Sequence, residues 1–197
     1  MLAAGDIVNG EYSVVGRLGE GRWGVTYEAV SACGERVALK CLSLRTMREW
    51  KALDMFEREA RVLRSLHHPA IPAYLASFHT DTERDRSFFL VQRLASGSTL
   101  QHLVESGWRG TEEEVVDIAV QVLDVLAYLE TLSPPVVHRD INPRNILLDP
   151  TTGRVSLVDF GGSQESSLVG SMGSTVVGTV SGGLIRGWAW LGTKSGM

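Results

Sequence analysis

The sequence predicts an α+β fold, in which groups of strands alternate with single helices. Three observations support this prediction. Residues 12–42 are rich in the β-branched and aromatic residues typical of strands. Residues 112–132 have the periodicity of a long amphipathic helix. The predicted order is strands, helix, strands, helix, strands, which differs from the regular β–α alternation of a parallel sheet.

The first group of elements lies in the N-terminal half of the 197-residue chain. Glycine-containing turns separate three expected strands, at Tyr12–Val15, Val25–Tyr27 and Val37–Leu42. A helix is expected over residues 46–66, because Thr46 and Glu49 match a capping box. Its apolar residues recur at helical spacing, at Phe56, Ala60, Leu63 and Leu66, and His67-His-Pro69 ends it.

The remaining elements follow in the C-terminal half. A short buried strand is expected at Phe88–Val91. The helix at 112–132 begins with a capping box made by Thr111 and Glu114, and Pro134-Pro135 follows it. Its expected apolar face consists of Val115, Ala119, Val122, Leu126 and Leu129. A hairpin then joins strands at Ile146–Leu148 and Val155–Val158 through Asp149–Gly153.

Composition excludes several classes of protein. Apolar residues make up 44% of the chain and charged residues 21%, as in ordinary globular proteins. The net charge of −4 argues against a nucleic-acid-binding protein. The two cysteines, Cys33 and Cys41, have neither disulfide-framework nor metal-site spacing. The first residues lack the basic start of a secretion signal, so we expect a cytoplasmic location.

Residues 162–197 differ sharply from the rest of the chain. They carry only three charges and nine of the 21 glycines. Residues 168–185 are uncharged, but only eight of these 18 residues are Leu, Val, Met or Ile, which is low for a membrane span. We therefore expect a flexible tail without membrane association.

The first chemical motif is a glycine-rich segment at residues 18–26, with glycines at positions 19, 21 and 24. Glycine allows the backbone to approach a phosphate group closely. The same spacing also occurs in ordinary glycine-rich hairpin turns, so the motif by itself is weak. Its position between two predicted strands favours a flap over nucleotide phosphates rather than a dinucleotide-binding strand–helix turn.

The second motif is Lys40, one of only three lysines in the chain, within the predicted strand at 37–42. It could extend to solvent at the edge of the sheet, or its charge could bind phosphate oxygens. A half-buried lysine needs an acidic partner, and Glu59 on the following helix is the candidate. Glu57 lies about 200° away around that helix. The alternative for Glu59 is a solvated charge paired with a nearby arginine.

The third and fourth motifs are His138-Arg-Asp140 with Asn145, and Asp159-Phe-Gly161 after a predicted strand. Separately, they could be a surface ion-pair cluster and a turn-capping acid. Together, a carboxylate and an amide oxygen could hold Mg²⁺ and the phosphates of a nucleotide.

All of these motifs, in this order, resemble the protein kinase family over roughly residues 12–161. The resemblance is to bacterial-type and plant-like Ser/Thr kinases. It implies an N-lobe of antiparallel sheet plus one helix at 12–92, after an extension at 1–11. It also implies a hinge and partial helical C-lobe at 93–161, and an activation-segment remnant with a divergent tail at 162–197.

The resemblance also implies a role for each motif residue. Lys40 would hold the α- and β-phosphates of ATP and pair with Glu59, and Asp140 would accept or orient the proton of the substrate hydroxyl. Asn145 and Asp159 would bind Mg²⁺, and Leu63, His138 and Phe160 would form an apolar stack. Arg139 would pair with an activation-segment phosphate. The expected ATP-binding residues are Leu18, Gly19, Glu20, Gly21, Arg22, Trp23, Gly24, Val25, Thr26, Ala38, Lys40, Gln92, Arg93, Ala95 and Leu147.

Three positions depart from the family pattern. Asn142 stands where Ser/Thr kinases usually have a catalytic-loop lysine, and Thr26 replaces the usual valine. The chain has no Ala-Pro-Glu motif, and the resemblance ends after Thr179. We therefore expect a C-terminally truncated kinase that uses ATP, Mg²⁺ and a protein substrate. The alternative is a catalytically impaired nucleotide-binding or interaction fragment.

Overall fold

The computed structural model describes residues 1–21, 24–45, 51–82 and 85–165. These residues form two compact units. The first unit comprises Met1–His67 and Pro72–Ala95, and the second contains His68–Ile71 and the chain from Ser96 onward. The lobe boundary expected between residues 92 and 93 lies close to the end of the first unit at Ala95.

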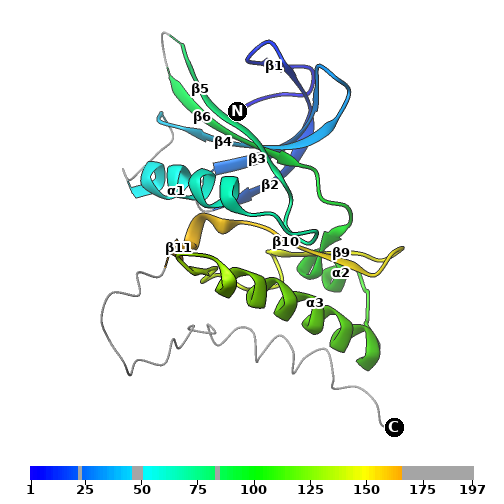
Figure 1. The fold of residues 1–197 in the computed structure, drawn as a ribbon. Coiled ribbons are helices and arrows are strands. Elements are labelled where there is room, and N and C mark those ends of the chain that lie inside the picture. The colour runs from blue at the N-terminus through cyan, green and yellow to red at the C-terminus, as the bar shows by residue number, and fades with distance from the viewer. Residues whose placement is uncertain (22–23, 46–50, 83–84, 166–197) are drawn as a thin grey trace. The chain divides into compact units, whose positions relative to one another are not determined.

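The first unit is built on a six-stranded antiparallel sheet in the order β1-β2-β3-β4-β6-β5 (Figure 1). Its strands are longer than expected from the sequence, and β2 continues through the first glycines of the glycine-rich segment. The strands are β1 (Ile7–Val8), β2 (Tyr12–Gly21), β3 (Gly24–Ser31), β4 (Arg36–Ser43), β5 (Tyr74–Asp81) and β6 (Arg86–Arg93).

Two of these strands were not expected from the sequence. β1 lies within the first eleven residues and pairs with β2, so part of the expected extension belongs to the sheet. β5 pairs with β6 at the other edge. The segment contains strand-favouring Tyr, Phe and Thr, but Ala, Ser and His separate them. No continuous β-rich run therefore marks the strand, and its pairing with β6 completes it.

The two faces of this sheet carry different residues, because neighbouring side chains along a strand point to opposite faces. One face forms an apolar core. The other face carries Lys40, opposite Thr26 on β3 and Leu90 on β6. The core residues are Val8, Tyr12, Val14, Tyr27, Ala29, Val37, Leu39, Phe89 and Val91.

Helix α1 (Lys51–Ser65) packs near β5 in this unit (Figure 1). The expected apolar positions Phe56, Ala60, Leu63 and Leu66 are buried. The expected start of the helix at residue 46, with the Thr46 and Glu49 cap, lies outside the described residues. The chain leaves the helix before His67-His-Pro69, as expected.

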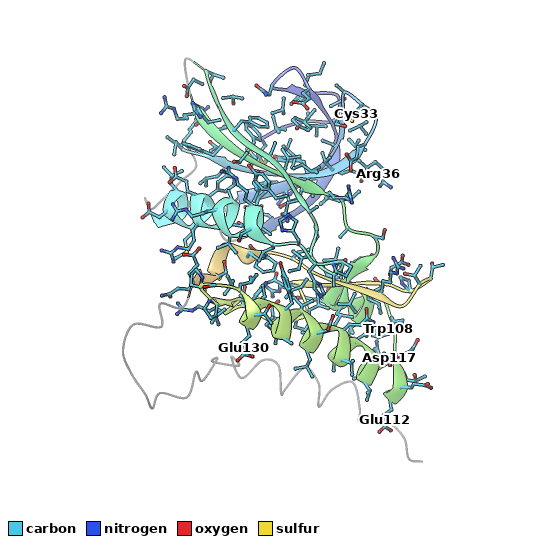
Figure 2. All side chains as sticks on the ribbon, viewed as in Figure 1. Cys33, Arg36, Trp108, Glu112, Asp117 and Glu130 are labelled. Atoms are coloured by element: carbon cyan, nitrogen blue, oxygen red, sulfur yellow. The ribbon has the colours of Figure 1, made fainter. Side chains whose placement is uncertain are left out.

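The second unit contains the longest helix, α3 (Glu112–Thr131). The predicted capping box is confirmed: Glu114 N–H donates to the Thr111 hydroxyl at 3.2 Å, and Thr111 N–H donates to the Glu114 carboxylate at 2.7 Å. The acidic residues in its first turn interact favourably with the positive end of the helix dipole. Figure 2 shows the carboxylates of Glu112 and Glu130 extending outward from this helix.

The expected apolar face of α3 was partly wrong. The buried residues are Ile118, Val122, Val125 and Leu129, whereas the expected Val115, Ala119 and Leu126 are only half-buried. Apolar residues occupy more than one face of this helix, so periodicity alone did not identify the buried one. Val116, Val120 and Leu123 are 53%, 57% and 61% exposed.

Short elements complete the second unit. The predicted hairpin is confirmed, with β9 (Ile146–Asp149) antiparallel to β10 (Arg154–Leu157). Unexpected elements are β7 (Ser98–Thr99), α2 (Leu100–Glu105), β8 (Val136–Val137), the 3₁₀ turn η1 (Phe160–Gly162) and β11 (Gln164–Glu165). Strand β11 pairs with β8.

Within the described ranges, no helix has both the length and the apolar character needed to cross a membrane. The uncharged segment at 168–185 lies outside those ranges, as does the rest of the predicted flexible tail from residue 166 onward. The prediction was wrong for the start of the tail, because Gly162 ends η1, Ser163 is buried, and Gln164–Glu165 form β11.

Candidate functional site

Lys40 and Glu59 form a buried ion pair in the first unit. The Lys40 ammonium donates to Glu59 Oε2 at 2.6 Å, and the two residues are 9% and 1% exposed. This confirms the predicted pairing and rejects the solvated alternatives for both residues. Glu57 on the same helix is exposed, as its angular separation predicts. Because each charge is buried, the pair fixes the side chain of Lys40 on its strand.

Several residues expected to bind ATP share the Lys40 face of the sheet. Ala38 is two positions from Lys40 on β4 and lies opposite Gln92 on β6. Thr26 on β3 lies opposite Lys40. Because opposite residues of an antiparallel pair share a face, these four side chains project to one side. Gln92 Nε2 also donates to the Pro72 carbonyl at 3.2 Å.

The glycine-rich segment forms a hairpin of β2 and β3, so the strand–loop–strand prediction is confirmed. A Cβ atom built on Gly24 would lie 2.3 Å from the Cys41 carbonyl oxygen, and Gly24 has a φ of +144°. The sheet itself therefore requires glycine there. By contrast, no described atom would lie within 4 Å of a Cβ atom on Gly19. That open space fits the close approach of a ligand phosphate.

The other expected ATP-binding residues of the first unit are mostly exposed where the structure describes them. Leu18 is 49% exposed, and Glu20 forms an ion pair with Arg17. Gly21 is exposed and Val25 half-buried, and the Arg93 side chain donates to Glu35 at 3.2 Å. Ala95 is the last residue of the unit, and Arg22 and Trp23 lie outside the described residues.

Asp140 is held by two amide side chains in the second unit. Asn142 Nδ2 donates to Asp140 Oδ1 at 2.8 Å, and Asn145 Nδ2 donates to Asp140 Oδ2 at 3.0 Å. Both amides also donate to the Asp140 carbonyl, at 3.2 and 2.9 Å. The carboxylate orientation is therefore fixed on both of its oxygens. Sequence reasoning identified Asn142 as a departure from the family but missed this contact.

His138 supports the loop that carries Asp140. It is 1% exposed, and its ring packs edge-on against Phe160 with centroids 4.6 Å apart. Its Nε2–H donates to the Val158 carbonyl at 3.2 Å, and its Nδ1 accepts the Asp140 N–H at 3.3 Å. Burial lowers the pKa of His138, which favours this neutral form. Leu63, the third residue of the expected stack, is buried in the first unit.

The two expected Mg²⁺ ligands lie in the same unit. The N–H of Val158 donates to the carbonyl of Asn145 at 2.9 Å, which brings the Asn145 loop beside the residue preceding Asp159. Asp159 has a left-handed φ of 63°, so its direction is set by an unusual backbone turn. Leu147, expected at the adenine, is half-buried on the adjacent β9.

The donor types at these two positions fit Mg²⁺. One carboxylate and one amide oxygen are hard ligands of the kind that Mg²⁺ accepts together with phosphate oxygens. Among the described residues, no three His, Cys, Asp or Glu side chains gather as a metal-binding cluster. A metal bound here would therefore depend on oxygen ligands from a nucleotide as well as from the protein.

Comparison with known proteins shows similarity over most of the chain. The family model described as the protein kinase domain matches residues 12–181. Serine/threonine-protein kinase B of Synechocystis is 32% identical over 166 residues, covering 78% of this chain and 27% of the relative. Serine/threonine-protein kinase cds1 of Schizosaccharomyces pombe is 30% identical over 177 residues, covering 87% and 37%. The chain thus spans well under half the length of these relatives.

Proposed function

Because the chain belongs to the protein kinase family, we propose that it transfers the γ-phosphoryl group of Mg·ATP to a serine or threonine hydroxyl of a protein. The observation that carries this proposal is the fixed Asp140 carboxylate, whose two oxygens each accept a hydrogen bond from an amide. A second support is the buried Lys40–Glu59 pair. Fixed geometry matters because phosphoryl transfer depends mainly on positioning and electrostatics.

In the first unit, Lys40 supplies a positive charge for the α- and β-phosphates. Glu59 holds its ammonium group in one position, so little side-chain entropy is lost when phosphate oxygens bind. Backbone N–H groups of the glycine-rich hairpin, near Gly19 and Gly21, approach the phosphates. Thr26 and Ala38 contact the adenine, and the backbone at Arg93–Ala95 offers it hydrogen bonds.

In the second unit, Asp140 orients the substrate hydroxyl and accepts its proton. Asn142 and Asn145 hold the carboxylate, and neutral His138 holds its backbone N–H. Asn145 and Asp159 would hold Mg²⁺, which would supply positive charge to the phosphate oxygens. We also propose that the chain acts on a protein substrate and is located in the cytoplasm.

Two measurements on the same preparation test this function. Titration calorimetry should detect ATP binding that requires Mg²⁺ and is weakened by Lys40→Met. A phosphotransfer assay with a mixed protein substrate should give incorporation that Asp140→Asn abolishes, while Asp140→Asn still binds ATP. A folded sample that binds no Mg·ATP contradicts the proposal.

The second candidate function is nucleotide binding without efficient phosphotransfer. Asn142 favours it, because an amide replaces the catalytic-loop cation expected from the family. Loss of one charge-stabilising group can lower the rate by about 100- to 1,000-fold. Under this candidate, Mg·ATP binds but labelled phosphate is not transferred. Recovery of transfer in Asn142→Lys would identify the missing cation as the cause.

A further inference from the structure

Arg144 is connected to Asp140 through a single side chain. Asn142 Nδ2 donates to the Asp140 carboxylate at 2.8 Å, and Asn142 Oδ1 accepts the N–H of Arg144 at 2.9 Å. All three residues lie in the second unit. The backbone of Arg144 therefore has a fixed position next to the carboxylate that is proposed to meet the substrate hydroxyl.

The guanidinium of Arg144 is also held in place. Its Nε donates to Gln101 Oε1 at 2.6 Å. Gln101 is itself held, because its backbone N–H donates to the Pro143 carbonyl at 3.0 Å and its Nε2 donates to Glu105 at 2.7 Å. Helix α2 thus fixes the plane of the guanidinium, which lowers the entropy lost when a ligand binds it.

The outer edge of this guanidinium is available. Arg144 is exposed, and within the described part of the chain its hydrogen bonds use only the backbone N–H and Nε. No ion pair with a described carboxylate forms at this residue, although Glu105 lies on the neighbouring helix. The two Nη groups form the fork that arginine offers to a two-oxygen anion.

We propose that Arg144 is a specificity-determining residue that binds a carboxylate side chain of the protein substrate, so that the preferred site is a serine or threonine with a nearby Glu or Asp. The inference rests on the proposed kinase function. An extended peptide advances about 3.3–3.6 Å per residue. Because the Asn142 side chain bonds both the Asp140 carboxylate and the Arg144 N–H, the acidic residue lies within a few positions of the acceptor.

A peptide series tests this directly. Each peptide has one serine, with Glu, Gln or Lys placed in turn at each of the four positions on either side. At the position that Arg144 reaches, the Glu peptide should have about fivefold higher kcat/KM than the Gln peptide, the size of a well-formed exposed ion pair. The effect should be mainly on KM, since Arg144 does not touch the reacting atoms.

Variants separate this role from a structural one. Arg144→Gln should abolish the difference in kcat/KM between the Glu and Gln peptides, and Arg144→Glu should favour the Lys peptide. Gln101→Leu should weaken the preference by releasing the guanidinium. Arg154 is also exposed and lies on β10 of the same unit, so Arg154→Gln should leave the peptide preference unchanged.

Two outcomes overturn the proposal without affecting the kinase function. One is phosphorylation of the Glu, Gln and Lys peptides at equal rates. The other is a phosphoserine peptide preferred more than about tenfold over the Glu peptide, which would assign the guanidinium to phosphorylated substrates. If no peptide is phosphorylated, the proposed kinase function is rejected. The proposed specificity is then tested by measuring peptide binding instead of phosphorylation. In fluorescently labelled peptides that have alanine in place of the acceptor serine, the Glu peptide should bind more tightly than the Gln peptide. Equal affinities would overturn the proposal.

Discussion

Removing one member of the Lys40–Glu59 pair should destabilise the first unit more than removing both. In Glu59→Gln, the ammonium of Lys40 would lose its charged partner while only 9% exposed. In Lys40→Met, the carboxylate of Glu59 would lose its partner while only 1% exposed. A buried charge that loses its oppositely charged partner still bears the cost of its lost hydration, with less electrostatic attraction to offset that cost.

The structure sets the magnitude of these effects. Breaking a buried ion pair on one side costs about 3–5 kcal/mol in unfolding free energy. The double substitution Lys40→Met with Glu59→Leu removes both charges and keeps similar volumes, so it should cost less than about 2 kcal/mol. The coupling energy between the two sites should therefore be several kcal/mol, far above the few tenths found for independent sites.

Urea denaturation followed by circular dichroism measures each unfolding free energy, with all four chains forming the double-mutant cycle. Glu57→Gln is the matched control, because Glu57 lies on the same helix but is exposed. It should change stability by less than about 0.5 kcal/mol. Additive costs, or a Glu59→Gln cost equal to that of the control, would refute the burial argument.

Three further predictions concern other parts of the chain. Burial lowers the pKa of His138, so the unfolded chain takes up the proton at a higher pH than the folded chain does. The unfolding free energy should therefore fall as the pH drops below about 6.5. In melts at decreasing pH, the unfolding free energy of His138→Gln should fall less steeply. Gly24→Ala should cost about 2–4 kcal/mol because its Cβ meets the Cys41 carbonyl, whereas Gly19→Ala should keep its melting temperature yet bind ATP more weakly. Thr111→Ala should cost about 1 kcal/mol in a urea melt by removing the α3 cap.

Elements with local signals were predicted well. The capping box of α3 uses residues three positions apart, and the turn at Asp149–Gly153 joins two adjacent strands, so short sequence windows contain both signals. The glycine-rich hairpin and the order of the motifs were also readable in this way. Strand β5 was missed because Ala, Ser and His separate its strand-favouring Tyr, Phe and Thr, so that its pairing with β6 decides the conformation.

The candidate site divides in the same way. The sequence by itself determined the residue types available for chemistry: a rare lysine, an acid one helix later, and the carboxylates and amides of two loops. Only the tertiary structure decided that Glu59 is buried against Lys40, that Asn142 and Asn145 hold Asp140, and that Gln101 holds Arg144. For Glu59 and Gln101, the physical reason is that their contacts join segments 19 and 43 positions apart, which no local pattern encodes. Asn142 and Asn145 are only two and five positions from Asp140, but their contacts depend on the folded conformation of the loop.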